Sequence, residues 1–273
     1  MLLSDYLAVV RGGGALGSGV ALRLHYAGFT VLVTELARPR CLRRAAALAQ
    51  AVYAGSITVE GVRARLAEDA LAGMAFAVRD DIPVVVDPDG EVVTRLQPRL
   101  VIDARRPLPP PGAYLPPNTL VIGLGAGFSA GVNCQAVIET TRGPHLGRVY
   151  WDGGVAQPDA PAEMGVSLLR APATGEFLTH AGLGAVLPAG AAVGEVAGLP
   201  VVAPADGWVL GLLADGLIVR AGDPVAELSL TPGRGEAALV SDQARAVGGG
   251  VLEAVLAGLP LWQPPADPDL GLP

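Results

Sequence analysis

The sequence contains no lysine, and all 19 of its basic residues are arginine. A chain without lysine cannot form a Schiff base with pyridoxal phosphate, has no P-loop lysine, and has no amine that could carry biotin or lipoate. The sequence therefore excludes pyridoxal phosphate, biotin and lipoate as covalently attached cofactors.

Cysteine and positive charge are also scarce. The two cysteines, Cys41 and Cys134, fit free thiols in a reducing compartment, and the net charge of −7 argues against nonspecific nucleic-acid binding. Asp5 interrupts the apolar N-terminus and Arg11 follows it, which does not fit a signal peptide. The longest uncharged stretch, residues 107–138, is broken by prolines and glycines and does not resemble a membrane helix. We expect a cytoplasmic protein without membrane or nucleic-acid partners.

Continuous apolar runs predict buried parallel strands, and helical patterns lie between several of them. The predicted strands span residues 7–10, 30–34, 82–87, 100–104 and 119–124, and the predicted helices span residues 16–27, 41–54 and 59–73. Strands that alternate with helices indicate the α/β class with a Rossmann-like parallel sheet. The proline-rich residues 105–118 predict a rigid connector across the sheet rather than a domain boundary.

The pattern changes near residue 165, where short β runs replace the charged helical patterns. Two segments repeat an apolar run, a glycine-containing turn and a second apolar run: VLPAGAAVGEVAG (186–198) and LIVRAGDPVAEL (217–228). The pattern is similar to that of biotinyl- and lipoyl-type barrel-sandwich domains. Because no lysine can carry a swinging arm, we expect this module to serve packing or docking.

We expect three parts along the chain: a Rossmann-like α/β domain (1–165), a small β-rich, barrel-sandwich-like module (166–235), and a C-terminal helix and tail (236–273). Ser241 or Asp242 is expected to cap the helix. Residues 262–273 are expected to form a frayed tail.

A glycine turn after the first predicted strand has the spacing of a dinucleotide-binding fingerprint. Gly12, Gly14 and Gly17 form GxGxxG between a strand and a helix. The first glycine permits the turn, the second lets a pyrophosphate approach, and the third lets helix and strand pack closely. The helix N-terminus supplies N–H groups for an anion. Glu35 ends the second strand, 23 positions after Gly12, where an acid holds the adenosine ribose and favours NAD over NADP.

Arg11 departs from this fingerprint, because an apolar residue usually precedes the glycines. An arginine at this position would bind an anion itself or pair with a buried acid. Two readings stay open at this point: a binding site for NAD or another nucleotide, or a turn that is purely architectural.

A second glycine cluster precedes the densest group of polar residues in the sequence. Gly123, Gly125 and Gly127 follow a predicted strand, as in a second phosphate-binding loop. The candidates for binding an anion or substrate that follow are Glu139, Arg142, His145 and Arg148. Two arginines that flank a histidine could grip a phosphate or carboxylate bidentately. In the alternative reading Arg142 pairs with Glu139 and the other residues cap a loop.

The remaining candidates are weaker. Arg43 and Arg44 fit a solvated or ion-paired face, and Cys134 fits a small buried residue better than a reactive thiol. His25 and His180 have no partner at metal-ligand spacing, so no metal site is predicted. Neither a Ser-His-Asp arrangement nor a pair of carboxylates can be recognised, so the catalytic residues stay unassigned.

Several segments, taken in order, resemble one family. They are RGGGALGSGVALRLHYAGF, ELARPRCLRRA, AVYAGSITVEGV, IPVVVDP, VIGLGAGFSAG and VIETTRGPHLGR, followed by APADGWVLGLL and AGDPVAEL. Together they resemble the YqeB-type accessory proteins of selenium-dependent molybdenum hydroxylases over nearly the whole chain. The resemblance implies a Rossmann-like protein that acts in the maturation of molybdenum hydroxylases related to xanthine dehydrogenase, in cofactor or selenium insertion.

The resemblance also marks residues that fall on family motifs, and three segments that depart from them. The residues on motifs are Arg11, Gly12, Gly14, Glu35, Arg43, Arg44, Glu60, Gly125, Gly127, Glu139, Arg142, Gly147 and Arg148. Ala15 stands where an acid is expected, and Pro144 stands where a histidine is expected. RRPLPPPG replaces a lysine-containing segment, in which Arg105 or Arg106 would supply charge but no nucleophile.

Three hypotheses follow. The first is an accessory or maturation factor that binds a nucleotide-like ligand at the glycine loops, with the β module docking the hydroxylase or its maturation machinery. The second is an NAD-dependent oxidoreductase in which His145 is the acid–base residue. The third is a non-catalytic scaffold or ligand-binding protein whose glycines only turn the chain. The apolar composition also fits a homodimer.

Overall fold

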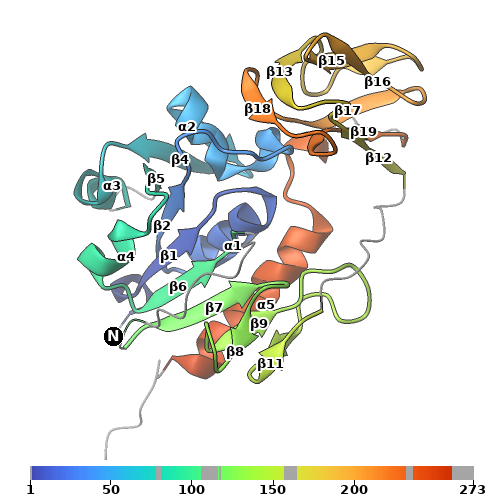
Figure 1. Cartoon of the computed structure of the whole chain (residues 1–273). Coiled ribbons are helices and arrows are strands. Elements are labelled where there is room, and N and C mark those ends of the chain that lie inside the picture. Colours follow the sequence, from blue (N-terminus) through green and yellow to red (C-terminus); the bar gives the residue numbers. More distant parts are fainter. Residues whose placement is uncertain are drawn as a thin grey trace, which may run out of the picture.

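A mostly parallel sheet forms the centre of the larger part of the molecule (Figure 1). The computed structural model describes residues 2–77, 81–105, 116, 118–156, 165–231 and 236–259. The strand order is β10-β9-β7-β6-β1-β2-β5-β4-β3, and neighbours are parallel except in the outermost pairs, β10–β9 and β4–β3. The strands are β1 (Leu7–Arg11), β2 (Thr30–Glu35), β3 (Ser56–Val59), β4 (Val62–Ala67), β5 (Ile82–Val86), β6 (Leu100–Asp103), β7 (Leu120–Leu124), β9 (Ala136–Ile138) and β10 (Val149–Tyr150). The strands predicted from apolar runs are β1, β2, β5, β6 and β7, and the α/β class is confirmed.

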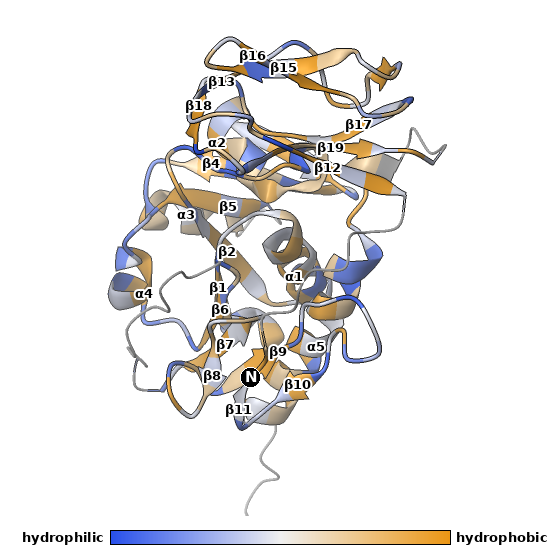
Figure 2. Ribbon diagram, turned by 45° about the vertical axis from the view of Figure 1, so that its right-hand side comes forward, coloured by the Kyte–Doolittle hydropathy of each residue, from blue (hydrophilic) through white to orange (hydrophobic). Residues whose placement is uncertain are grey.

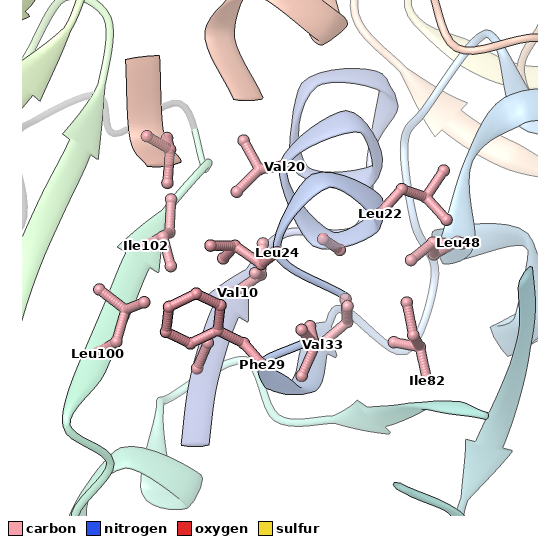
Figure 3. Packing of buried hydrophobic residues seen from close by; sticks show 14 of the residues in the cluster. Val10, Val20, Leu22, Leu24, Phe29, Val33, Leu48, Ile82, Leu100 and Ile102 are labelled. Carbon is pink, nitrogen blue, oxygen red and sulfur yellow. The ribbon is translucent and has the colours of Figure 1, made fainter. Parts of the chain in front are cut away.

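Helices cover both faces of this sheet, as the alternation of buried residues in the strands requires. In β1, Ala8 and Val10 contribute to the core with α1 and α5, whereas Val9 contributes to the core on the opposite face with α3 and α4. Figure 3 shows Leu24 and Phe29 lying over Val10 in the first of these cores. The helices are α1 (Ala15–Tyr26), α2 (Ala51–Ala54), α3 (Ala70–Ala77), α4 (Glu91–Leu96) and α5 (Asp242–Gly258), with 3-10 turns at Leu3–Asp5, Arg44–Ala46, Leu48–Gln50 and Glu236–Ala238.

The helix predicted over residues 59–73 is wrong for most of its length. β3 and β4 form a hairpin whose two turn residues, Glu60 and Gly61, have φ values of 47° and 88°. Two consecutive residues with positive φ make a turn that matches the twist of paired strands. The Glu60 carboxylate accepts a hydrogen bond from the Val240 N–H at 3.0 Å and lies 3.3 Å from the Arg245 guanidinium. These long-range bonds stabilise the hairpin, and helical periodicity does not reveal them.

The helix predicted over residues 41–54 is also mostly wrong, because only the four-residue α2 is α-helical there. The Leu42 carbonyl accepts a hydrogen bond from the Leu212 N–H at 2.8 Å, and Arg44 Nε donates to the Leu212 carbonyl at 2.7 Å. Leu212 lies in the β-rich part of the chain. Residues 42–44 are therefore arranged by contacts with that part rather than by local helix propensity.

The β-rich part consists of two antiparallel sheets, β12-β19-β17-β14 and β16-β15-β13-β18, that enclose their own core. The strands are β12 (Val166–Arg170), β13 (Gly175–Thr179), β14 (Val186–Leu187), β15 (Ala192–Val196), β16 (Leu199–Val202), β17 (Gly207–Leu212), β18 (Leu217–Val219) and β19 (Pro224–Ser229). Each predicted repeat crosses between the sheets, from β14 to β15 and from β18 to β19. The module lies at one end of the α/β part (Figure 2). Hydrophobic residues, coloured orange, occur along strands of both parts.

The chain returns from the module to the α/β core in α5. Ser241 is the N-cap, and its hydroxyl accepts a hydrogen bond from the Ala244 N–H at 3.2 Å. We keep the division into residues 1–165, 166–235 and 236–273 as a proposal. Most of the predicted connector (105–118) and the whole predicted tail (262–273) lie outside the described residues. None of the described helices has the length and apolarity that a membrane crossing needs.

Candidate functional site

The first glycine turn joins β1 to α1 as the fingerprint predicts. Gly12 has a φ of +97°, which favours glycine, and a side chain at Gly17 would overlap the Gly12 carbonyl. Gly14 is the N-cap of α1 and has no side chain to accept from the first-turn N–H groups. A methyl group at Gly14 would meet only Cys41 Cβ, at 3.8 Å. Gly12 and Gly17 therefore shape the turn. Gly14 occupies the N-cap position, but it supplies no side-chain hydrogen bond to the N–H groups of the first helical turn.

Glu35 ends β2 beside this turn. One carboxylate oxygen accepts from the Gly13 N–H and the other from the Leu36 N–H, both at 2.8 Å. Burial raises the pKa of Glu35, although the two N–H donors oppose this effect. Because a carboxylate oxygen can accept two hydrogen bonds and each Glu35 oxygen accepts one here, Glu35 keeps acceptor capacity for ribose hydroxyls.

The buried hydroxyl of Ser18 holds the chain after β2 against the turn. It donates to the Gly13 carbonyl at 2.9 Å and accepts from the Leu48 N–H at 2.8 Å. The Ala49 N–H also donates to the Gly13 carbonyl, at 2.8 Å. Residues 48 and 49 are therefore fixed to the glycine turn, a role of Ser18 that the sequence interpretation missed.

Charged side chains gather where β1, β5 and β6 end. Arg11 Nη1 lies 3.9 Å from Asp103 Oδ2, and Arg105 binds the same carboxylate through Nε at 3.0 Å and Nη2 at 2.7 Å. Burial, and secondly the nearby Arg105, lower the pKa of Arg11. Arg11 Nε is buried and finds no hydrogen-bond partner among the described residues. Of the two predicted roles of Arg11, pairing with a buried acid is observed, through Asp103.

Asp87 supports the same edge of the sheet from β5. Its carboxylate accepts hydrogen bonds from the N–H groups of Gly90, Glu91 and Val92 at 2.9–3.0 Å, which fixes the start of α4. Gly90 lies against the Arg11 guanidinium, since a side chain there would come within 2.5 Å of Nη2. The sequence signal for Asp87 and Asp103 is an acid that ends an apolar run, and it was overlooked.

The second glycine turn has a different continuation. β7 leads into β8 (Ser129–Ala130) and β9, so no described helix begins after Gly123, Gly125 and Gly127. A side chain at Gly123 would overlap the ring of buried Phe128, and one at Gly125 would lie 2.5 Å from Thr140 Oγ1. No helix N-terminus of the described residues therefore follows this cluster directly, and its role in binding a phosphate stays a prediction. Packing against Phe128 accounts for Gly123.

The candidate residues after this turn lie in a loop that packs against α5. Arg142 Nη1 donates to Asp242 Oδ2 at 2.8 Å, and this bond lowers the pKa of Asp242. Gly147 approaches α5 so closely that a side chain would lie 2.7 Å from the Ala246 carbonyl oxygen. The predicted pairing of Arg142 with Glu139 is not among the bonds observed, in which Glu139 accepts from the Thr141 N–H at 2.8 Å.

His145 and Arg148 are exposed in the same loop. His145 Nδ1 lies 3.4 Å from the Tyr150 hydroxyl, and the Arg148 N–H donates to the His145 carbonyl at 3.0 Å. Their role in ligand binding stays a prediction, because no bond among the described residues connects them with the first glycine turn.

Neither thiol is activated, and Cys134 is buried whereas Cys41 is half-buried. Burial raises the pKa of Cys41 to about 12 and that of Cys134 to about 11. Neither thiol has the lowered pKa that a nucleophile at neutral pH needs. Within the described part of the chain, no group of three or more His, Cys, Asp and Glu side chains is placed to bind a metal.

Comparisons with solved structures and family models add little. No protein-family model matches the chain. Part of a single-chain, multi-domain long-chain acyl-CoA carboxylase is 27% identical over 36% of this chain and 10% of that chain, with a TM-score of 0.23. An aspartoacylase family protein from Mesorhizobium loti is 10% identical over 83% of this chain and 85% of that chain, with a TM-score of 0.27. Scores this low support no argument about fold or function.

The sheet order, the glycine turn and the two-sheet module define a Rossmann-like α/β protein with a barrel-sandwich-like module. The chain is 40% identical over 256 residues to YqeB of Escherichia coli K12, which is described as an uncharacterized protein. The match covers 92% of this chain and 47% of that protein, so the chain spans about half the length of its relative. The chain is therefore similar to YqeB over nearly its whole length, which confirms the resemblance of its motifs to YqeB-type proteins, and the description of that relative states no accessory role.

Proposed function

We propose that the protein is a cytoplasmic accessory factor for maturation of a molybdenum hydroxylase, and that it binds a nucleotide-like ligand at the first glycine turn. The observation that carries the binding proposal is the uncapped N-terminus of α1 at Gly14, immediately after the strand and glycine turn of β1. The accessory role comes from the family resemblance, and in it the β module docks the hydroxylase or its maturation machinery.

The side chains around the turn fit such a ligand. The helix N-terminus attracts an anionic phosphate through its dipole and its N–H groups. Glu35 has acceptor capacity left for ribose hydroxyls. NAD and other dinucleotides therefore fit the residues on the β2 side of the turn, with Glu35 disfavouring a 2′-phosphate.

The proposal is tested by the melting temperature of the purified protein with NAD, NADH, NADP, ATP, CTP and molybdopterin cytosine dinucleotide. A ligand that binds only the native state raises the melting temperature by mass action. We expect one nucleotide to raise it, and Gly14→Val to abolish the rise. Gly182→Val is the matched control, at an exposed glycine that has no positive φ and nothing near its absent side chain. If no nucleotide raises the melting temperature at saturating concentration, the nucleotide site is wrong.

A further inference from the structure

Residues 36–44, which we call the cover segment, run from the end of β2 over the glycine turn. Cys41 lies against Gly14, 3.8 Å from where a side-chain carbon of Gly14 would stand. This is the glycine that a pyrophosphate approaches in a dinucleotide-binding turn. In Figure 1 the light-blue chain around α2 lies between the central strands and the module. The cover segment therefore occupies space that the proposed ligand needs.

The module holds the cover segment through four arginines. Their partners in the module lie between residues 212 and 227, on β17, β18, β19 and the turns between them. Arg38 donates to the Gly216 carbonyl, Arg40 to the Ile218 carbonyl (2.7 Å) and Asp223 (2.8 Å), Arg43 to Glu227 (2.6 Å), and Arg44 to the Leu212 carbonyl (2.7 Å). The start of the segment is also fixed by the Glu35 bond to Leu36, and the chain that follows the segment is fixed at residues 48 and 49 to the glycine turn.

The side chains that join the cover segment to the module pack closely and are largely shielded from solvent. The side chains of Arg43 and Glu227 are only 17% and 18% exposed, so water and salt screen this ion pair less than a surface pair. A side chain at Gly211 would come within 3.0 Å of both Leu42 Cβ and Glu227 Oε2. Cys41, next to Leu42 in the chain, is half-buried. The cover segment can therefore leave Gly14 only when contacts with the module break.

We propose that the cover segment is a gate held closed by the module, so that ligand entry at Gly14 is coupled to release of the segment from the module. This inference rests on the proposed nucleotide site and adds its regulation. A ligand that binds only the open form has an apparent affinity equal to its intrinsic affinity multiplied by the fraction of protein in the open form. A partner that draws the module away from the cover segment would therefore increase nucleotide affinity, and the nucleotide would favour that partner equally.

The test uses the two cysteines as probes and needs no ligand. The double variant Arg40→Gln/Arg43→Gln breaks two of the ion pairs and keeps Glu227, whose charge raises the pKa of Cys41. Arg63→Gln, on β4, removes the ion pair of Arg63 with Asp81 and is the control. Each protein is treated with a thiol reagent, and modification of Cys41 and Cys134 is followed separately by peptide mass spectrometry. We expect Cys41 to react about tenfold faster in the double variant and Cys134 to keep its rate, because the opening is local.

Two results would overturn the gate. Cys41 could keep its rate in the double variant, or both thiols could accelerate in parallel, as they do when the whole protein loosens. The nucleotide found by thermal shift should also bind the double variant about tenfold more tightly than the native protein, and Arg63→Gln should not change its affinity. If no nucleotide binds either protein but Cys41 alone is modified faster in the double variant, the proposed nucleotide site is wrong and the proposed release of the cover segment is supported.

Discussion

The two glycine turns of the sheet look alike in sequence and differ in structure. Gly12, Gly14 and Gly17 connect a strand to a helix, and Gly14 has neither a structural clash nor a positive φ that requires glycine. Gly123 and Gly125 connect a strand to further strands, and the space beside each is filled by a side chain of this chain. A glycine without a structural reason, at a helix N-terminus, is the better candidate for a ligand site.

The largest expected effect tests the architectural glycines of the first turn. Gly17→Ala should lower the free energy of unfolding by about 3 kcal/mol, because the added methyl group overlaps the Gly12 carbonyl and backbone cannot move aside cheaply. Gly14→Ala should change it by less than about 0.5 kcal/mol, because the methyl group meets only Cys41 at contact distance. Urea unfolding measures both. Equal losses for the two variants would contradict the separation of their roles.

A smaller loss of stability is expected at the second turn. Gly123→Ala should cost about 2 kcal/mol, because the methyl group displaces the Phe128 ring, which is a side chain and can shift. Adding Phe128→Leu to Gly123→Ala should recover part of the loss if the clash is the cause. Urea unfolding of the two single variants and the double variant gives the coupling. Losses that simply add would show that the two positions do not interact.

The two acids beside the turns give a third contrast, in binding rather than stability. Glu35→Gln should weaken nucleotide binding about tenfold, because the amide loses one acceptor oxygen and the charge that ribose hydroxyls favour. Glu139→Gln should leave the affinity unchanged. Isothermal titration with the nucleotide found by thermal shift measures both constants. A loss at Glu139 as large as the loss at Glu35 would move the ligand toward the second turn.

The smallest effect is the contribution of Glu35 to the pH dependence of stability. Its pKa is raised above the ordinary 4.5, mainly by burial, so the native state holds the proton more tightly than the unfolded state. This contribution is fully present below pH 4.5 and is lost as the pH rises through the raised pKa. Glu35→Gln should lack this loss of stability, whereas Glu139→Gln should keep it. Unfolding by urea across the pH series would disprove the assignment if Glu35→Gln and native protein show parallel curves.

Local patterns predicted the framework of the fold. Strands β1, β2, β5, β6 and β7, helix α1 and the repeat of the module follow from apolar runs and glycine positions, which act over a few residues. The hairpin at Glu60 and the irregular chain after Cys41 could not be predicted in this way. Their conformations depend on bonds to Val240 and Leu212, which lie far along the sequence.

The candidate site was predicted in part, for a similar reason. Gly12, Gly14, Gly17 and Glu35 lie together, because their spacing belongs to one strand–helix–strand unit. The bonds of Arg43 and Arg44 to the module, and the position of Cys41 against Gly14, depend on how the module packs. No spacing within the first 60 residues contains that information.

The most direct measurement is isothermal titration of native protein, Gly14→Val and Gly123→Ala with the nucleotide that raises the melting temperature most. We predict that Gly14→Val removes binding while the fold is kept, and that Gly123→Ala binds as the native protein does despite its lower stability. Unchanged binding by Gly14→Val, or loss of binding only in Gly123→Ala, would contradict the assignment of the ligand site to the first glycine turn.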